Sequence, residues 1–289
     1  MFQIIGIVLL FALVFGSYMI SGGKFPVILH AAPHELMAIG GAAVAAMLIS
    51  NSFKTIKGVG AGFATVFKGP KWKAKDYTDL LSLLFLLTKT MKSKGVIALE
   101  SHIEKPEEST IFSRYPKLGK DHFAVDFICV TLRMMTMNLE DPHQVEDAME
   151  KQLEKHHHEA QAPAHALQTL ADALPALGIV AAVLGVIKTM GAITEPPEVL
   201  GEMIGSALVG TFLGVFLAYG MVGPFATRMK EVIDEEGSFY KIIQSVLVAH
   251  LHGNAAQISV EIGRGNVPSG AQPSFLELEE ALSNIPAEA

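Results

Sequence analysis

The sequence predicts an all-α, polytopic membrane protein with four transmembrane helices and a helical cytoplasmic domain inserted between helices two and three. Composition is the first reason: 50% of the 289 residues are hydrophobic and only 18% are charged, whereas about 25% are charged in ordinary soluble domains. The mean hydropathy is +0.38. The second reason is a pair of apolar runs at residues 174–193 and 204–226. Each is long enough for a helix to cross a hydrocarbon core about 30 Å thick.

Two further apolar runs open the chain. Residues 1–20 resemble a signal peptide in length, but they lack a basic start and a small-x-small cleavage site before Lys24, which favours a retained helix. Residues 34–51 are rich in glycine and alanine, which permit close helix packing. We therefore expect residues 1–50 to form a first transmembrane hairpin, with helices at about 1–20 and 34–51, and residues 174–226 to form the second.

The distribution of lysines predicts the topology. Nine lysines lie between residues 54 and 94, whereas Lys24 is the only basic residue between the first two spans and residues 194–203 contain none. Arg228 and Lys230 follow the last span directly. Since cytoplasmic loops carry an excess of Lys and Arg, we expect both termini and the long segment at 51–173 to be cytoplasmic.

The predicted cytoplasmic domain, residues 51–173, has a helical pattern throughout. Residues 77–91 carry a leucine stripe wide enough to be covered on two sides. Residues 123–137 and 141–161 continue the helical periodicity, and there are few strand signals and no glycine-rich nucleotide loop. Beyond the last span, we expect residues 227–289 to be a cytoplasmic C-terminal helical segment.

Charge and composition exclude several classes of function. A net charge of −7 argues against a nucleic-acid partner, and the single cysteine, Cys129, excludes an internal disulfide. The consecutive histidines at 156–158 point about 100° apart on a helix, so they cannot converge on one metal ion. Acidic pairs such as Asp121 and Asp126 have no nucleophile beside them. We expect no enzyme, no metal site and no cofactor.

The two long apolar runs carry glycines and hydroxyls but no Asp or Glu. Gly201 with Gly205 and Gly210 with Gly214 have the small-xxx-small spacing that lets membrane helices pack closely. An ion carrier inside a membrane must be ionisable. The pattern therefore predicts one wall of an ion path whose carrier lies on another chain.

Five motifs, in order, suggest a family. They are MISGG at 19–23, MKSKGVIALESHIEKPEESTIFSRYP at 91–116, ADALPALGIVAAVLGVIKTMG and ALVGTFLGVFLAYGMVGPFAT in the second hairpin, and PSFLELEEAL at 273–282. Together they resemble the MotA family of flagellar motor stator proteins, which is related to ExbB and TolQ. The resemblance covers essentially the whole chain.

The resemblance implies a torque-generating stator subunit in the bacterial inner membrane. In that family a pentameric ring of MotA subunits surrounds a MotB dimer, and MotB supplies the aspartate that binds the ion. The complex couples inward ion flow to rotation through the rotor protein FliG. The implied partners are therefore MotB, further copies of this chain, FliG and membrane lipid.

Thr211 and Ala182 are the residues that the resemblance places at the ion path. Thr211 matches the family's hydroxyl beside the partner carboxylate; the residue type alone leaves open a bond to a carbonyl one turn earlier in its own helix. Sodium-type members have a threonine at the position of Ala182. A methyl group supplies no oxygen to sodium, so we expect H+ rather than Na+ as the transported ion. Lys188 is expected to snorkel to the interface.

Pro175 and Pro224 match the family's two functional prolines. Within a helix a proline removes one hydrogen bond and bends the chain, which can form a hinge. The residues alone leave open a helix-start role for Pro175 and a helix-stop role for Pro224.

The family's rotor contact uses an arginine and a glutamate. Glu100 falls on the glutamate within LESHIE, and Lys92 falls on the arginine, which keeps the charge but loses the planar fork. Lys89 and Lys94 are alternative candidates for the same contact. On residue type alone, a solvated surface charge is the usual role of such a lysine or glutamate.

Two other function classes remain open. An energiser of outer-membrane transport of the ExbB or TolQ kind would typically have three spans, so the four spans and the proline pair favour a stator. A solute transporter would carry internal repeats and an intramembrane charge, and neither is evident in the sequence.

Overall fold

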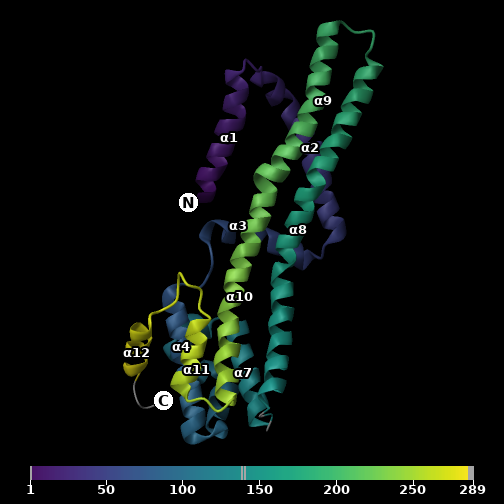
Figure 1. Ribbon diagram of the computed structural model, residues 1–289. Coiled ribbons are helices and arrows are strands. Elements are labelled where there is room, and N and C mark those ends of the chain that lie inside the picture. The colour runs from purple at the N-terminus through teal and green to yellow at the C-terminus, as the bar shows by residue number, and fades with distance from the viewer. Residues whose placement is uncertain (1, 138, 140, 286–289) are drawn as a thin grey trace. The chain divides into compact units, whose positions relative to one another are not determined.

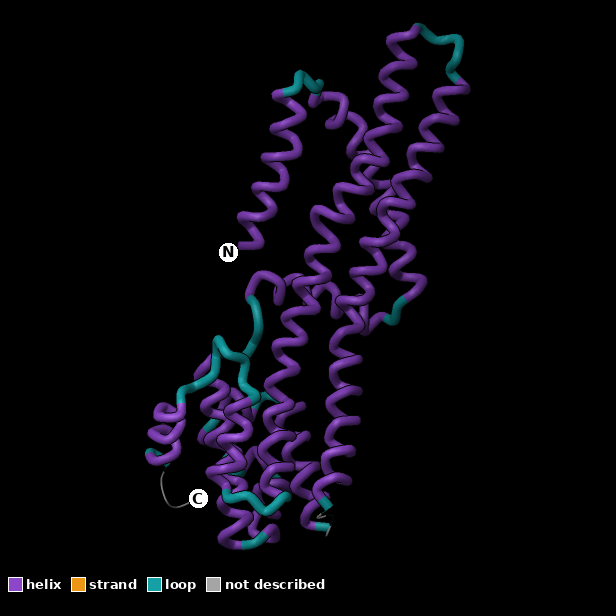
Figure 2. The backbone as a smooth tube through the Cα atoms, viewed as in Figure 1, coloured by secondary structure: helices purple, strands orange, loops and turns teal. Residues whose placement is uncertain are grey.

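The computed structural model describes residues 2–137, 139 and 141–285, and every regular element in these ranges is a helix (Figures 1 and 2). Four helices are long and apolar enough to cross a membrane: Phe2–Ile20, Phe25–Ser50, Pro142–Gly191 and Pro197–Leu251. The predicted all-α class and the four spanning helices are confirmed.

The elements follow one another as helices of very different length. They are α1 (Phe2–Ile20), α2 (Phe25–Ser50), α3 (Phe53–Lys68), α4 (Ala74–Lys94), η1 (Val96–Leu99), α5 (Glu100–Glu104), η2 (Pro106–Glu108), η3 (Phe112–Arg114), α6 (Pro116–Gly119), α7 (His122–Thr136), α8 (Pro142–Gly191), α9 (Pro197–Leu217), η4 (Ala218–Val222), α10 (Gly223–Leu251), α11 (Ala256–Gly265) and α12 (Phe275–Ser283).

Contacts divide the chain into two compact units. Residues 1–69 and 161–232 form the first, here called the span unit, and residues 70–160 and 233–289 form the second, the inserted unit. Residues 51–69 and 161–173, which the sequence assigned to the cytoplasmic domain, thus make their contacts with the spanning helices.

The second helix is longer than the sequence predicted. Instead of 34–51, α2 runs over 26 residues from Phe25 to Ser50, because Pro26 occupies the first turn, where its missing N–H costs nothing, and Pro33 does not break the helix. The consequence is that Glu35, expected at the start of the span, lies well inside it.

Small and aromatic side chains hold the span unit together. Ile39 and Ala43 of α2 are buried against Leu174 and Ala181 of α8, and α2 also packs along α9. Helix α1 has no buried residue. Its contacts include the ring of Phe15, which meets three neighbouring rings at centroid distances between 5.4 and 5.9 Å.

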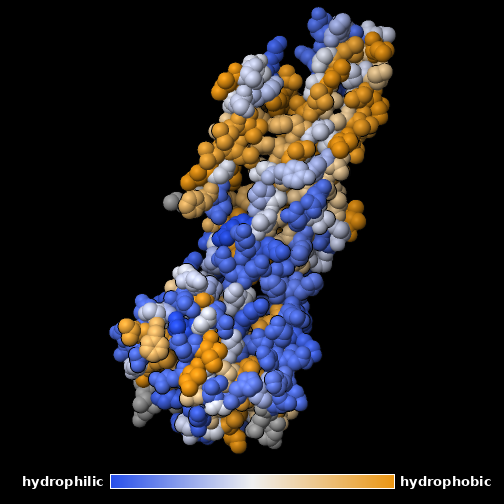
Figure 3. Space-filling model, viewed as in Figure 1, coloured by the Kyte–Doolittle hydropathy of each residue, from blue (hydrophilic) through white to orange (hydrophobic). Residues whose placement is uncertain are grey.

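Helix α3 is a short amphipathic helix on the span unit. Its buried face carries Val59, Gly62 and Val66, and the rings of Phe63 and Phe67 lie 5.6 and 5.7 Å from that of Phe225 in α10. The rest of the span unit exposes large apolar side chains, particularly on α1 and α8, and Figure 3 shows them covering much of the visible face of these helices. Such a surface is typical of a protein solvated by lipid or by partner helices.

Helix α4 is the centre of the inserted unit. Every residue from Leu80 to Thr88 is buried, which confirms that the leucine stripe is covered on two sides. Helices α11 and α12 pack against α4, and Phe239 of α10 stacks on Trp72 with ring centroids 3.9 Å apart. The burial of so many leucines stabilises the unit, at about 25 cal/mol per Å² of apolar surface removed from water.

Asp121 makes structural contacts within the inserted unit. Its Oδ1 accepts a hydrogen bond from the Ala124 amide at 2.8 Å and so caps α7. Its Oδ2 pairs with the Lys71 ammonium and accepts a 3.2 Å hydrogen bond from the Tyr240 hydroxyl. This carboxylate therefore ties three segments of the inserted unit together.

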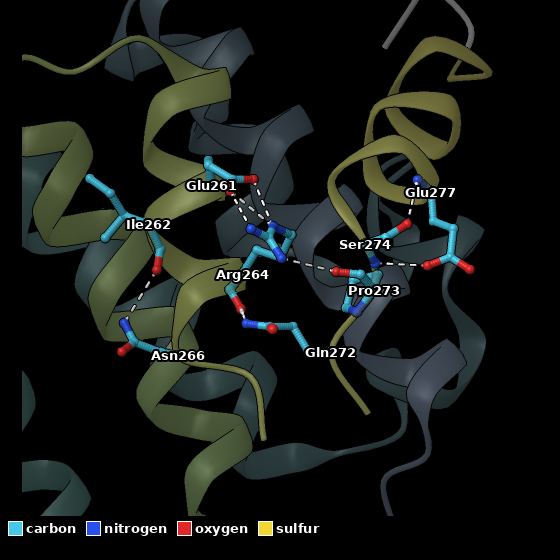
Figure 4. A network of polar contacts seen from close by, with 8 residues as sticks. All are labelled: Glu261, Ile262, Arg264, Asn266, Gln272, Pro273, Ser274 and Glu277. Atoms are coloured by element: carbon cyan, nitrogen blue, oxygen red, sulfur yellow. Dashed lines mark hydrogen bonds and ion pairs between the residues drawn. The ribbon is translucent and has the colours of Figure 1, made fainter. Parts of the chain in front are cut away.

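A polar network fixes the end of the chain onto α11 (Figure 4). The Arg264 guanidinium donates to both carboxylate oxygens of Glu261 and, at 3.1 Å, to the carbonyl of Pro273. Ser274 and Glu277 then form a capping box that starts α12. The PSFLELEEAL motif is thus a helix start held by an arginine.

The consecutive histidines do not converge on one point, as expected: His156 and His157 have different partners. His156 stacks on Phe123 with centroids 3.5 Å apart, and His157 Nε2 lies 3.3 Å from Asp234. Among the described residues no group of three or more His, Cys, Asp or Glu side chains could hold a metal ion.

Acid should destabilise the inserted unit through His156. Burial lowers the pKa of this histidine below its ordinary value of 6.5, outweighing the nearby Asp121. Because the unfolded chain then binds a proton that the folded chain does not, stability is complete above about pH 6.5 and falls as the pH drops below it. Thermal unfolding of the purified full-length protein should show this loss, and His156→Phe should reduce it. His158→Phe, at an exposed position, is the matched control; an equal loss in both variants contradicts the assignment.

Candidate ion path

A contact between the backbones of α8 and α9 forms the core of the candidate site. A Cβ atom added to Gly214 would lie 2.7 Å from the carbonyl oxygen of Leu174 and 3.0 Å from the Cα of Gly178. A Cβ atom on Gly178 would lie 3.1 Å from the carbonyl oxygen of Gly210. Only glycine allows this approach at both helices.

The predicted glycine pairs therefore differ in their roles. Gly210 and Gly214 do pack against another helix, as their spacing predicted. Gly201, in contrast, has no described atom within 4 Å of an added Cβ, and Gly205 meets only a side-chain atom of Val27 at 3.6 Å. Spacing identifies candidate packing positions, but the partner helix decides which of them are used.

The hydroxyl of Thr211 bridges the two helices. Thr211 Oγ1 donates a long hydrogen bond of 3.5 Å to the carbonyl oxygen of Gly178 in α8. The alternative of a bond to a carbonyl within its own helix is therefore wrong. Thr211 is half-buried, and its hydroxyl lies at the seam between the two helices.

Ala181 and Ala182 sit beside this seam with different exposure. Ala181 is buried, and its methyl would lie 3.3 Å from a Cβ at Gly210, whereas Ala182 is half-buried. Neither side chain offers an oxygen. The Gly178 carbonyl of α8 and the Thr211 hydroxyl of α9 are polar groups at this contact.

Glu35 of α2 is a site residue that the sequence analysis missed. A Cβ at Gly210 would collide with Glu35 Oε2, so this carboxyl lies directly against the residue that precedes Thr211. The statement that no intramembrane charge is evident is therefore wrong. Pro26 could have revealed this position, because a proline is favourable in the first turn of a helix. A helix that starts there contains Glu35 in its interior.

A cavity of about 840 Å³ opens beside Glu35. Its walls come from the turn between α1 and α2, from α2, and from the adjoining ends of α8 and α9. Lys188, expected to snorkel, is exposed and lines this cavity together with Glu202.

Pro175 and Pro224 lie within continuous helical segments. Helix α8 passes through Pro175 without ending, so the helix-start alternative is wrong. The helix-stop alternative for Pro224 is wrong too, because α10 continues from Gly223 to Leu251. Just before it, η4 is a turn of π-helix in which the Gly223 amide donates to Ala218. Proline lacks an amide proton, so both sites leave weak points in helices that otherwise continue.

The predicted rotor residues all lie on the surface of the inserted unit. Lys89, Lys92 and Lys94 are exposed in the last turns of α4, and Glu100 is exposed at the start of α5. The Lys89 ammonium lies 5.5 Å from the centre of the Phe85 ring. Both charge signs are therefore presented close together along the chain, around the α4–η1–α5 connection.

Comparison with protein families gives two matches. Residues 4–95 match the model described as "Motility protein A N-terminal", and residues 120–241 match the model described as "MotA/TolQ/ExbB proton channel family". The chain is 38% identical to Motility protein A of Salmonella typhimurium over 285 residues, which is 99% of this chain and 96% of that protein. It is 37% identical to Motility protein A of Escherichia coli with the same coverage.

Solved structures show the same fold. The structure of C. jejuni MotAB matches with a TM-score of 0.71 at 18% identity, covering 94% of this chain and 98% of that one. The flagellar MotAB stator complex from Bacillus subtilis matches with a TM-score of 0.66 at 25% identity, covering 89% and 92%.

A methyl group at Gly214 should force α8 and α9 apart. Gly214→Ala places a Cβ against backbone atoms that cannot rotate away, which typically costs about 1–3 kcal/mol. We expect a lower unfolding temperature of the detergent-purified protein and loss of function. Gly201→Ala adds the same methyl where no described atom is near and should change neither. Equal behaviour of the two variants contradicts the contact.

Proposed function

Because this chain belongs to the MotA family of flagellar motility proteins, we propose that it forms the ring of a stator that couples inward proton flow to rotation of the flagellum. Family models cover residues 4–95 and 120–241, and four helices are long and apolar enough to span a membrane. It is a multi-pass membrane protein of the inner membrane. We assign the inserted unit and both termini to the cytoplasm on the distribution of lysines.

The partner in this proposal is a MotB dimer inside a pentameric ring of this chain. The C-terminal part of α8 and the whole of η4 contain no carboxylate, and α9 has only Glu198 and Glu202 near its start. A partner helix that carries an aspartate would supply the ionisable group that α8 and α9 do not themselves provide beside Thr211. The exposed apolar side chains of α8, such as Ile179 and Val183, provide a surface for such a helix.

The ion in this proposal is the proton. Sodium needs several oxygen ligands to replace its hydration shell, and Ala181 and Ala182 supply none beside the seam. A proton needs only the partner carboxylate and water. Crossing the membrane potential supplies about 2.3 kcal/mol per charge per 100 mV, which limits the work available to each ion.

A conformational change at the ion path would be transmitted along the two longest helical segments. Helix α8 contributes residues to both the inserted unit and the span unit, and the α9–η4–α10 segment does the same. Pro175 and the π turn before Pro224 interrupt their hydrogen-bond ladders. Protonation of the partner carboxylate would release its contact at Thr211, and the helices would bend at these weak points.

The rotor contact would be made by the exposed charges of α4 and α5. Lys92 and Glu100 present opposite signs to charged residues of FliG, with Lys89 and Lys94 in support. Exposed ion pairs contribute only about 0–1 kcal/mol each. A weak contact suits a step that must form and break repeatedly.

Restoration of swimming tests the proposal. In a flagellated strain that lacks its stator, this chain together with its MotB should restore motility. Thr211→Ala should abolish most of it, and Thr211→Ser, which keeps the hydroxyl, should retain it. Swimming speed should be insensitive to sodium and collapse with a protonophore. Sodium-dependent swimming would overturn the choice of ion; full swimming of Thr211→Ala would overturn the site, and defective iron–siderophore uptake in a deletion strain with normal swimming would favour an ExbB-like energiser.

Charge reversal tests the rotor contact. Glu100→Lys and Lys92→Glu should each reduce torque, measured as the rotation rate of tethered cells, while leaving proton flux unchanged. Because Lys89 and Lys94 share the positive surface, Lys92→Glu should have the smaller effect. Lys105→Glu, at an exposed position that pairs with the neighbouring Glu108, is the matched control. A torque loss equal to that of the control would contradict the assignment.

A further inference from the structure

The carboxyl of Glu35 reaches the contact between α8 and α9. Glu35 lies within the apolar helix α2, and its Oε2 is buried without a hydrogen-bond partner among the described residues. Gly210, which this oxygen touches, is also the residue that approaches Ala181 of α8. Three helices thus meet around one carboxylate oxygen, next to Thr211.

Burial of the Glu35 carboxyl without a hydrogen-bond partner among the described residues costs free energy, which points to a function for this group. A buried polar atom without a partner costs about 1–3 kcal/mol, and more when it is charged. An ionisable side chain within a membrane span marks, by default, a path for ions or protons. The glycine at 210 has a direct physical reason here, because any larger residue would occupy the volume of the Glu35 carboxyl.

The cavity beside Glu35 connects this carboxyl to polar side chains at the ends of the helices. Lys24 lies in the turn between α1 and α2, and His30 and His34 lie along α2. Lys188 lies near the end of α8, and Glu202 and Ser206 lie in the first turns of α9. In the topology that the lysines predict, this end of the helices faces outside, where protons enter.

We propose that Glu35 is a second proton-carrying carboxyl of the channel, which receives protons from the outer cavity and passes them to the partner's carboxylate beside Thr211. This inference rests on the proposed stator function. Glu35 then binds each proton first. The carboxylate of MotB is therefore not the sole proton carrier, because this chain supplies one of its own.

The step is a simple proton relay. The ionised Glu35 carboxylate takes one proton from a hydronium ion in the cavity, which leaves water. The resulting carboxylic acid gives that proton to the ionised carboxylate of the partner, and Glu35 returns to its starting charge. No other bond forms or breaks, and no further reactant is needed.

Charged neighbours on every adjoining element would modulate this relay. His30 and His34 belong to the same helix as Glu35, Lys188 comes from α8, Glu202 from α9, and Lys24 from the preceding turn. These are the titratable and charged side chains that line the cavity together with Glu35.

Proton flux tests the proposal in cells that express the full chain together with MotB, read by a cytoplasmic pH indicator at several external pH values. Glu35→Gln should lower the flux at least about tenfold, the range expected when a positioned proton carrier is lost. Glu35→Asp should recover most of it with an altered pH profile. Glu198→Gln, in the first turn of α9 and outside the cavity lining, should match the wild type.

Copurification with MotB separates a relay defect from a failure to assemble. A Glu35→Gln complex that assembles and conducts like the wild type at every pH overturns the relay. If Glu35→Gln does not accumulate, Gly210→Ala and Glu35→Asp decide, because each displaces the carboxyl without removing it; unchanged pH profiles in both overturn the relay. A wild-type complex that conducts no protons contradicts the proposed stator function itself.

Discussion

The structure of the candidate site depends on the backbone contact between α8 and α9. Hydrocarbon chains are as apolar as leucine, so membrane helices gain little by burying leucines against each other and rely on close packing instead. Gly178, Gly210 and Gly214 provide that packing. The same contact brings Thr211 within reach of a carbonyl on the neighbouring helix and leaves room at Gly210 for the carboxyl of Glu35.

Tightly packed stretches alternate with stretches of weakened hydrogen bonding along α8 and along the α9–η4–α10 segment. The glycine contact fixes α8 to α9 at the level of Thr211, whereas Pro175 and the π turn before Pro224 weaken the ladders one to three turns away. Beyond these points α8 and α10 enter the densely packed inserted unit, whose central helix α4 is buried from Leu80 to Thr88. In the proposed mechanism, a change at the seam bends the helices at these weak points, while both packed regions keep their internal contacts.

Hydropathy predicted the fold well because membrane spans need long apolar helices and little else. The apolar runs at 174–193 and 204–226, the leucine stripe of α4 and the four spans followed from this rule. Helix boundaries were harder to predict from the sequence. Helix α2 starts at Phe25 rather than at residue 34, and Pro26 is compatible with either a turn or the first turn of a helix. That single boundary decided whether Glu35 lay at the start of the membrane helix or well inside it.

The candidate site could be predicted only in part. The resemblance supplied Thr211 and both prolines, but which glycine touches which helix depends on the rotation of α8 against α9, and no local pattern encodes it. Gly201 and Gly210 have the same spacing to their partners in sequence, yet only Gly210 lies against another helix. The position of the Glu35 carboxyl beside Gly210 could not be predicted, because it depends on how α2 packs along α9.

The central claim is that the partner's carboxylate works at the seam between α8 and α9. A structure of the complete complex with MotB in a lipid bilayer measures this directly, as the distance from the MotB aspartate to Thr211 Oγ1. The account predicts that at least one aspartate lies within hydrogen-bond reach of this hydroxyl, directly at about 2.6–3.2 Å or through one water. A MotB helix that packs against α1, with its aspartate remote from Thr211 in every subunit, would contradict the account.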